Sequence, residues 1–380
     1  NLTGSGRDFY KRILTRLLMH REQEFLNAAK TGDQETFIRI LNDQSININP
    51  NLADKDGKTA FIIAVENNQS DIVSTLLADE RVDPNQADVY GTTALMWAVY
   101  RGRVDVIRAL LADVRIDPNH ADGDGNTAFI LAAENGQSDI VSTLLADARV
   151  EPNRTNIYDE AALSGATRNG DIYIVRALLA DERIDPNHDN NRGGTALFWA
   201  VYEGHIDIVR ALLADERVNP NLANYRRETA LTLAAENGHS DIVRALIDDP
   251  RIDLSHADQA KKAIKAATVN KHDKTLLLLL KSSGQRLSVD EIANLTGSGR
   301  DFYKRILTRL LWRASFRGII RAIIVFRNMR LRAAEAIYAP GGTGYTVAAD
   351  SFATAARQQS SSSGILTSTE TNDTLSLIHI

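Results

Sequence analysis

Histidine is the residue type in this chain best suited to metal binding or proton transfer, and its eight copies are dispersed. No HExxH motif occurs, and no two histidines stand four residues apart, the spacing that places two ligands on one face of a helix. Five of them fall instead within an internal repeat, either in the connections between its units or at the start of the second helix of a unit. These are His120, His188, His205, His239 and His256. We therefore predict no metal site.

Other catalytic patterns are also missing from the sequence. There is no GxSxG, GxGxxG or Walker motif, and Gly341–Gly344 is glycine-rich without a following lysine, which favours a flexible turn. The chain contains no cysteine, so disulfides, cysteine-ligated zinc and thiol nucleophiles are excluded. The prediction is a protein with no catalytic residues, no cofactor and no small-molecule substrate.

Composition narrows the partner class further. The 380 residues are 43% hydrophobic and 24% charged, with a net charge of −5, which argues against a chain built around nucleic acid. No uncharged apolar run reaches the roughly 18 residues that a membrane-spanning helix needs.

The elements that would position any site are set by an internal repeat of 34 residues. Six prolines, each followed by asparagine, are spaced 34 residues apart, and we call these equivalent positions the repeat lattice. Thr-Ala pairs, single glycines and Leu-Leu pairs recur at the same interval. So many residue types on one lattice indicate stacked copies of one structural unit. The prolines are Pro50, Pro84, Pro118, Pro152, Pro186 and Pro220.

Each unit is predicted to form two short helices and a turn. In residues 93–102 apolar side chains have helical spacing, and Gly102 suits the helix end. Residues 104–112 make the second helix, Pro118 interrupts helical continuation, and Gly125 permits a tight turn. One pair cannot bury its apolar faces alone, so its neighbours must cover them.

These residues resemble the ankyrin repeat, whose pattern is D-x-x-G-x-T-A-L-x-x-A-A-x-x-G-x-x-x-I-V-x-x-L-L. In the third unit it is matched by Asp122, Gly125, Thr127, Ala128, Ala132, Ala133, Gly136, Ile140, Val141, Leu144 and Leu145. The resemblance covers about residues 24–281 and implies an all-α solenoid with short β-hairpin-like fingers. The units here have 34 residues where 33 are common, and we place the extra one in the connection before the proline.

The domain organisation follows from the repeat and from the two ends. Residues 1–18 reappear without change at 294–311, which has two open interpretations: tandem duplication of a larger unit, or an assembly or cloning artefact. Since the first residue is not Met, the chain is interpreted as processed or a fragment, with Met19 as a candidate start. The predicted divisions are a helix at 1–23, a capping half-repeat at 24–53, six repeats at 54–257, a capping repeat at 258–281, a basic helical extension at 282–339, and a disordered Ser/Thr-rich tail at 340–380 that one interpretation treats as non-native.

The resemblance also implies where a partner binds. In ankyrin solenoids, finger residues and first-helix residues near the terminal glycine face the partner, and tyrosine and arginine are common in binding hot spots. Trp97 and Trp199 are interpreted as core residues, and Asp88 and Asp122 as turn-stabilising. The candidate partner-binding residues are Tyr90, Tyr100, Arg101, Tyr158, Arg168, Tyr202, Tyr225 and Arg226.

The leading hypothesis is a non-enzymatic scaffold or adaptor, monomeric and cytoplasmic, that binds an unidentified protein through the concave face. Three alternatives stay open: a targeting arm of a larger, truncated enzyme; a bacterial effector delivered to a host cell; and membrane-surface association. The last would use the arginine-rich apolar stretch 313–332 as a basic amphipathic helix.

Overall fold

The computed structural model describes residues 4–45, 47–252 and 257–282, and these form helices joined by loops and turns. The predicted basic extension beyond residue 282, the second copy at 294–311, the stretch 313–332 and the tail at 340–380 lie outside the described residues. All features below belong to the compact unit that ends at Gln285.

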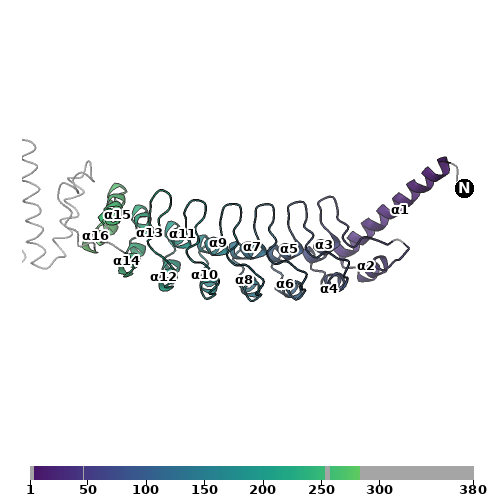
Figure 1. The fold of residues 1–380 in the computed structure, drawn as a ribbon, viewed down its shortest axis with the longest axis horizontal. Coiled ribbons are helices and arrows are strands. Elements are labelled where there is room, and N and C mark those ends of the chain that lie inside the picture. Colours follow the sequence, from purple (N-terminus) through teal and green to yellow (C-terminus); the bar gives the residue numbers. More distant parts are fainter. Residues whose placement is uncertain (1–3, 46, 253–256, 283–380) are drawn as a thin grey trace, which may run out of the picture. The chain divides into compact units, whose positions relative to one another are not determined.

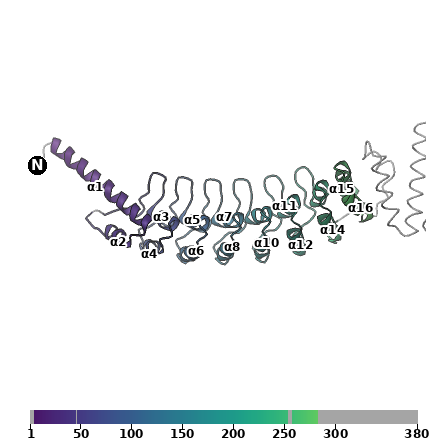
Figure 2. The same cartoon turned by 180° about the vertical axis from the view of Figure 1, so that it is seen from behind.

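Two rows of short helices run through this unit, and six loops project from the first row on the side away from the second (Figures 1 and 2). The first row, here called the inner helices, comprises α3 Ala60–Glu66, α5 Ala94–Tyr100, α7 Ala128–Glu134, α9 Ala162–Arg168, α11 Ala196–Glu203 and α13 Ala230–Asn237. The second row, the outer helices, comprises α4 Ser70–Ala78, α6 Val104–Leu111, α8 Ser138–Leu145, α10 Ile172–Leu179, α12 Ile206–Ala214 and α14 Ser240–Asp248. The predicted helix-turn-helix solenoid is confirmed.

The ends of the stack are helical as well. At one end lie α1 Gly4–Thr31 and α2 Gln34–Leu41, and at the other α15 Ala257–Val269 and α16 Asp273–Ser282. The predicted division between residues 23 and 24 falls inside α1, which is continuous. Its last turns join the core, where Phe25 is fully buried and stacks on Phe37 with ring centroids 4.5 Å apart.

The lattice threonines start the inner helices. Thr127, for example, stands at the N-cap of α7, and its hydroxyl accepts the backbone N–H of Ile130 at 3.3 Å. This bond satisfies one of the amides that an isolated helix end leaves unpaired. The same cap is made by Thr59, Thr93, Thr195 and Thr229.

The six loops are the predicted fingers. Isolated antiparallel bridges close four of them, as Ala53–Thr59 does in the first, so the hairpin-like geometry is confirmed in those four. Asp122 stabilises its turn as predicted, because Oδ1 accepts the N–H groups of Asp124 and Asn126 at 3.0 and 2.8 Å. Gly57 is required at its turn for two reasons: its φ is +77°, and a Cβ there would lie 2.8 Å from the backbone N of Val89 in the next finger.

Backbone hydrogen bonds join the first four fingers in a row. The N–H of Val89 donates to Asp56 O, that of Gly123 to Tyr90 O, and that of Ile157 to Asp124 O, at 2.9 to 3.1 Å. Among the described residues no equivalent bond links the fourth finger to the fifth or the fifth to the sixth. In the fourth finger Asp159 (φ +57°) occupies the position of the turn glycine.

The fourth unit also lacks stabilising features that the other units have. Ala161 replaces the capping threonine, and α9 has no side-chain cap. Gly165 lies inside that helix, where glycine is less favourable than alanine by about 1 kcal/mol. The nearest atoms to the space above Gly165 belong to Glu134 of the preceding unit. The buried hydroxyl of Thr167 has no hydrogen-bond partner in the described part of the chain.

The connections between units carry a second repeated feature, an Asp-x-Arg sequence. In the third unit Arg149 binds Asp147 through Nε and Nη2, and Nη2 also donates to Leu111 O of the preceding unit at 2.7 Å. Nη1 donates to the carbonyls of Ile116 and Asp113 at 3.1 and 3.3 Å. Each guanidinium therefore holds its own connection against the preceding unit. The arginines are Arg81, Arg115, Arg149, Arg183, Arg217 and Arg251.

The asparagine after each lattice proline binds the connection of the following unit, which is the connection that contains that unit's Asp-x-Arg sequence. Asn119 Nδ2 donates to Arg149 O at 2.7 Å, and its Oδ1 accepts the N–H of Glu151 at 2.8 Å. This explains why Pro-Asn recurs as a pair: the proline ends the preceding segment and the asparagine amide is an inter-unit bridge.

Candidate functional site

The fingers and the inner helices form one surface, which we call the finger face. The predicted partner-binding residues all belong to its elements: four to inner helices or the turns that end them, and the other four to fingers. Exposed fractions of the tyrosines are 73% for Tyr90, 45% for Tyr100, 57% for Tyr158, 52% for Tyr202 and 62% for Tyr225. Arg101 and Arg226 are also exposed, whereas Arg168 is partly covered by its ion pairs.

The first aromatic cluster is built around Trp97 on α5. Its indole Nε1 donates to Asp88 Oδ2 at 3.0 Å, and Tyr100 packs edge-on against its ring at 5.9 Å. The Lys58 ammonium lies 3.8 Å from the ring centroid, within the range of a cation–π interaction. Glu66 then binds both Lys58 and Arg101, at 2.6 and 2.7 Å.

A second aromatic cluster lies three units further on, around Trp199 of α11. Tyr202 again packs edge-on at 5.9 Å, and the Arg168 guanidinium lies 5.9 Å from the indole centroid. Arg168 is held by Glu160 at 2.8 Å and more distantly by Glu134 at 3.6 Å. The two clusters thus present the same aromatic pair with a cation beside it.

The prediction that Trp97 and Trp199 are core residues is wrong. Both are half-buried and contribute to the finger face. The signal was in the sequence: each tryptophan precedes a tyrosine by three residues, and residues three apart share one face of a helix. An exposed tyrosine therefore places the tryptophan on the same surface. The contacts of Lys58 with Trp97 and of Glu66 with Arg101 were not predicted, because each joins residues of two successive units.

Charges shift the pKa values of several groups on this face. Burial raises the pKa of the Tyr100 phenol, and the carboxylates of Asp122, Glu134 and Asp124 raise it further. Burial also raises the pKa of Glu134, with Arg168 opposing the shift. At Glu66 burial has the same effect, but the bonds from Lys58 and Arg101 outweigh it and lower the pKa. Three of the carboxylates that raise the pKa of Tyr100 belong to the third unit.

The described side chains of this face offer contacts for binding. Among the described residues no three His, Asp or Glu side chains converge in a way that could hold a metal ion. His205 Nε2 lies 3.3 Å from Arg168 O and His272 Nε2 lies 2.9 Å from Glu236 O, so these rings join successive units. No helix in the described ranges is long and apolar enough to cross a membrane.

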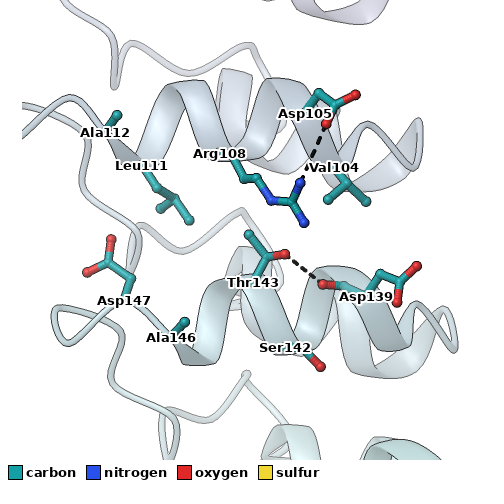
Figure 3. A pocket seen from close by; sticks show the side chains of 10 residues that line it. All are labelled: Val104, Asp105, Arg108, Leu111, Ala112, Asp139, Ser142, Thr143, Ala146 and Asp147. Carbon is teal, nitrogen blue, oxygen red and sulfur yellow. Dashed lines mark hydrogen bonds and ion pairs between the residues drawn. The ribbon is translucent and has the colours of Figure 1, made fainter.

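A shallow hollow lies among the outer helices, away from the finger face. It lies between outer helices α6 and α8, and Arg108, Leu111, Ser142 and Thr143 are among its lining residues (Figure 3). Within it Arg108 pairs with Asp105 at 3.7 Å, and Thr143 Oγ1 donates to the backbone carbonyl of Asp139. The hollow is open and offers no buried polar group, so the finger face is the stronger candidate.

The two aromatic clusters also differ in the acceptor of the indole N–H, which gives a testable prediction. Trp199 Nε1 is buried without an acceptor in the described structure, because Asn190 stands where the first cluster has Asp88. Asn190 Oδ1 already accepts the N–H groups of Arg192 and Gly194, which leaves only its donor amide. We expect Asn190→Asp to supply the acceptor and raise the free energy of unfolding by about 1 kcal/mol.

Urea unfolding followed by tryptophan fluorescence measures this change. The reciprocal substitution Asp88→Asn removes the acceptor from Trp97 and should lower stability by a similar amount. Destabilisation by Asn190→Asp would show that the Trp199 N–H is not the limiting defect.

The stacked helix pairs and their fingers define this chain as a helical-repeat solenoid. A family model described as ankyrin repeats, three copies, matches residues 14–88, 80–156, 129–224 and 214–290, so the chain belongs to the ankyrin-repeat family. The crystal structure of the ankyrin repeat protein EF0377 is similar, with 27% sequence identity and a TM-score of 0.47, covering 52% of this chain and 99% of that one. No curated protein matches this chain. Ankyrin repeats are in general protein–protein interaction modules and generally have no enzymatic activity.

Proposed function

We propose that this protein is a monomeric, cytoplasmic, non-enzymatic scaffold or adaptor that binds a protein partner through its finger face. The observation that supports it is the set of five tyrosines on that face, each at least 45% exposed. Large apolar rings held in solvent by a rigid array provide contact area at little cost in conformational entropy. The aromatic clusters fix two of these rings, Tyr100 and Tyr202, in place.

The partner-binding residues of this proposal are those predicted from the sequence, together with Trp97 and Trp199. Truncating a tyrosine that is a binding hot spot costs about 2 kcal/mol or more, which is about thirtyfold in affinity. We therefore expect the triple substitution Tyr90→Ala, Tyr100→Ala, Tyr202→Ala to abolish partner capture.

The experiment is a pull-down from native lysate with the full chain and this triple variant, with circular dichroism of both. Tyr173→Ala is the matched control, because Tyr173 lies on outer helix α10 and is 76% exposed. Proteins retained by the parent and by the control, and lost from the triple variant, would support the proposal. Equal capture by all three chains would contradict the assignment of the finger face.

A further inference from the structure

The tips of the six fingers differ from one another in chemistry. Each tip presents two residues between the turn Asp or Asn and the residue with positive φ. In unit order the pairs are Lys55–Asp56, Val89–Tyr90, Gly123–Asp124, Ile157–Tyr158, Asn191–Arg192 and Tyr225–Arg226.

The second and fourth tips are apolar and solvent-facing. Val89 and Tyr90 are 63% and 73% exposed, and Ile157 and Tyr158 are both 57% exposed. Each tip thus combines a β-branched aliphatic side chain with an aromatic ring. Such side chains gathered outside the core of a soluble protein mark an interaction surface.

The third finger lies between these two and is bonded to both. Gly123 N–H donates to Tyr90 O at 2.9 Å, and Ile157 N–H donates to Asp124 O at 3.0 Å. Gly123 has no side chain, and a Cβ there would lie 3.2 Å from Tyr90 O. Of the Gly123–Asp124 pair, only Asp124 therefore has a side chain, and its finger lies between the two apolar tips. The loops stand next to one another in both ribbon views (Figures 1 and 2).

The charge of Asp124 is available to a partner. Its side chain is exposed and makes no hydrogen bond or ion pair with any described residue, since the bonds of this residue use its backbone N–H and carbonyl. The last two fingers carry the opposite charge, with Arg192 and Arg226 at their tips. The potential over the fingertips therefore changes sign along the array.

We propose that the second, third and fourth fingertips bind an extended segment of a partner protein in which a lysine or arginine lies between apolar residues. The cation pairs with Asp124, and the apolar neighbours pack on the Val89–Tyr90 and Ile157–Tyr158 tips. Apolar burial provides most of the affinity, and the carboxylate selects the sign of the charge. This inference rests on the proposed function and specifies the partner's chemistry.

The test uses the full chain and two fluorescein-labelled twelve-residue peptides, GVKVSVKVSVKG and GVEVSVEVSVEG, followed by fluorescence anisotropy at low salt. We expect the lysine peptide to bind at least about tenfold more tightly than the glutamate peptide. Asp124→Lys should weaken binding of the lysine peptide about tenfold, because attraction becomes repulsion. The double variant Tyr90→Ala, Tyr158→Ala should weaken it at least as much.

Asp139→Lys is the control, since Asp139 is exposed on outer helix α8 of the same unit. It should leave binding of the lysine peptide unchanged. Binding of neither peptide, equal binding of both, or equal loss in Asp124→Lys and Asp139→Lys would overturn the proposal. If the tyrosine-dependent capture persists in the pull-down despite such a result, the partner chemistry is wrong and the binding function stands.

Discussion

Replacing Arg149 with alanine is expected to lower the free energy of unfolding by about 3 kcal/mol, because it removes charge-assisted bonds and leaves a carboxylate unpaired. The lost bonds join the guanidinium to Asp147 and to the carbonyls of Leu111 and Ile116 in the preceding unit. Asp147 Oδ2 would lose its 2.6 Å partner. Urea unfolding followed by circular dichroism provides the measurement.

Two further variants separate geometry from charge. Arg149→Lys keeps the charge but cannot make the forked contacts, so we expect it to recover only a minor part of the loss. Arg108→Ala removes an exposed pair with Asp105, separated by 3.7 Å, and should change stability by less than about 0.5 kcal/mol. A loss at Arg149 no larger than that at Arg108 would show that the connections do not hold the units together.

Acid is expected to unfold the array as pH falls below about 4, through the aspartates of the same connections. Bonds from the neighbouring arginine side chain lower the pKa of each of these carboxyls below the ordinary value of 3.8. A group with a lowered pKa in the folded state stabilises the fold fully above its unfolded value, and this contribution is lost as pH falls through the folded value. The aspartates are Asp79, Asp113, Asp147, Asp181, Asp215 and Asp249.

Glu134 acts in the opposite sense. Its raised pKa makes its ionised form unfavourable in the folded state at neutral pH, so this penalty is relieved on acidification. With six aspartates against one glutamate, the net effect is acid destabilisation. The urea midpoint measured between pH 7 and pH 3 tests this, and Asp147→Asn should make its pH dependence shallower than Asp139→Asn does. A midpoint independent of pH over this range would contradict the prediction.

The sequence predicted the repeat architecture because the same residues determine each unit locally. Thr127 predicts a helix start because a threonine hydroxyl caps the third amide, and Gly57 predicts a tight turn because glycine adopts a positive φ without strain. These effects act within a few residues of one another. They repeat at every unit in which the residue is present, and they fail in the fourth unit, where Ala161 replaces the cap.

Features that depend on the neighbouring unit were not predicted. The Asp-x-Arg sequence lies on the 34-residue lattice, yet Arg149 finds an acceptor 38 residues earlier in the chain. The partner is determined by how closely two units stack. The spacing of residues in the sequence does not give the distance between stacked units. The same reason accounts for the contact of Lys58 with the ring of Trp97 and for the ion pair of Glu66 with Arg101, both of which join successive units.

The offsets of these inter-unit bonds have a consequence for how the array changes over generations. Arg115, Arg149, Arg183, Arg217 and Arg251 each reach a leucine carbonyl 38 residues earlier, at 2.5 to 2.7 Å. Each of these five joints therefore has the same donor and the same acceptor. Unequal crossing-over that inserts or deletes a whole number of units brings together a matching donor and acceptor, and the new junction is bonded like the old ones. The connections thus let the chain change length without the selection of a new interface.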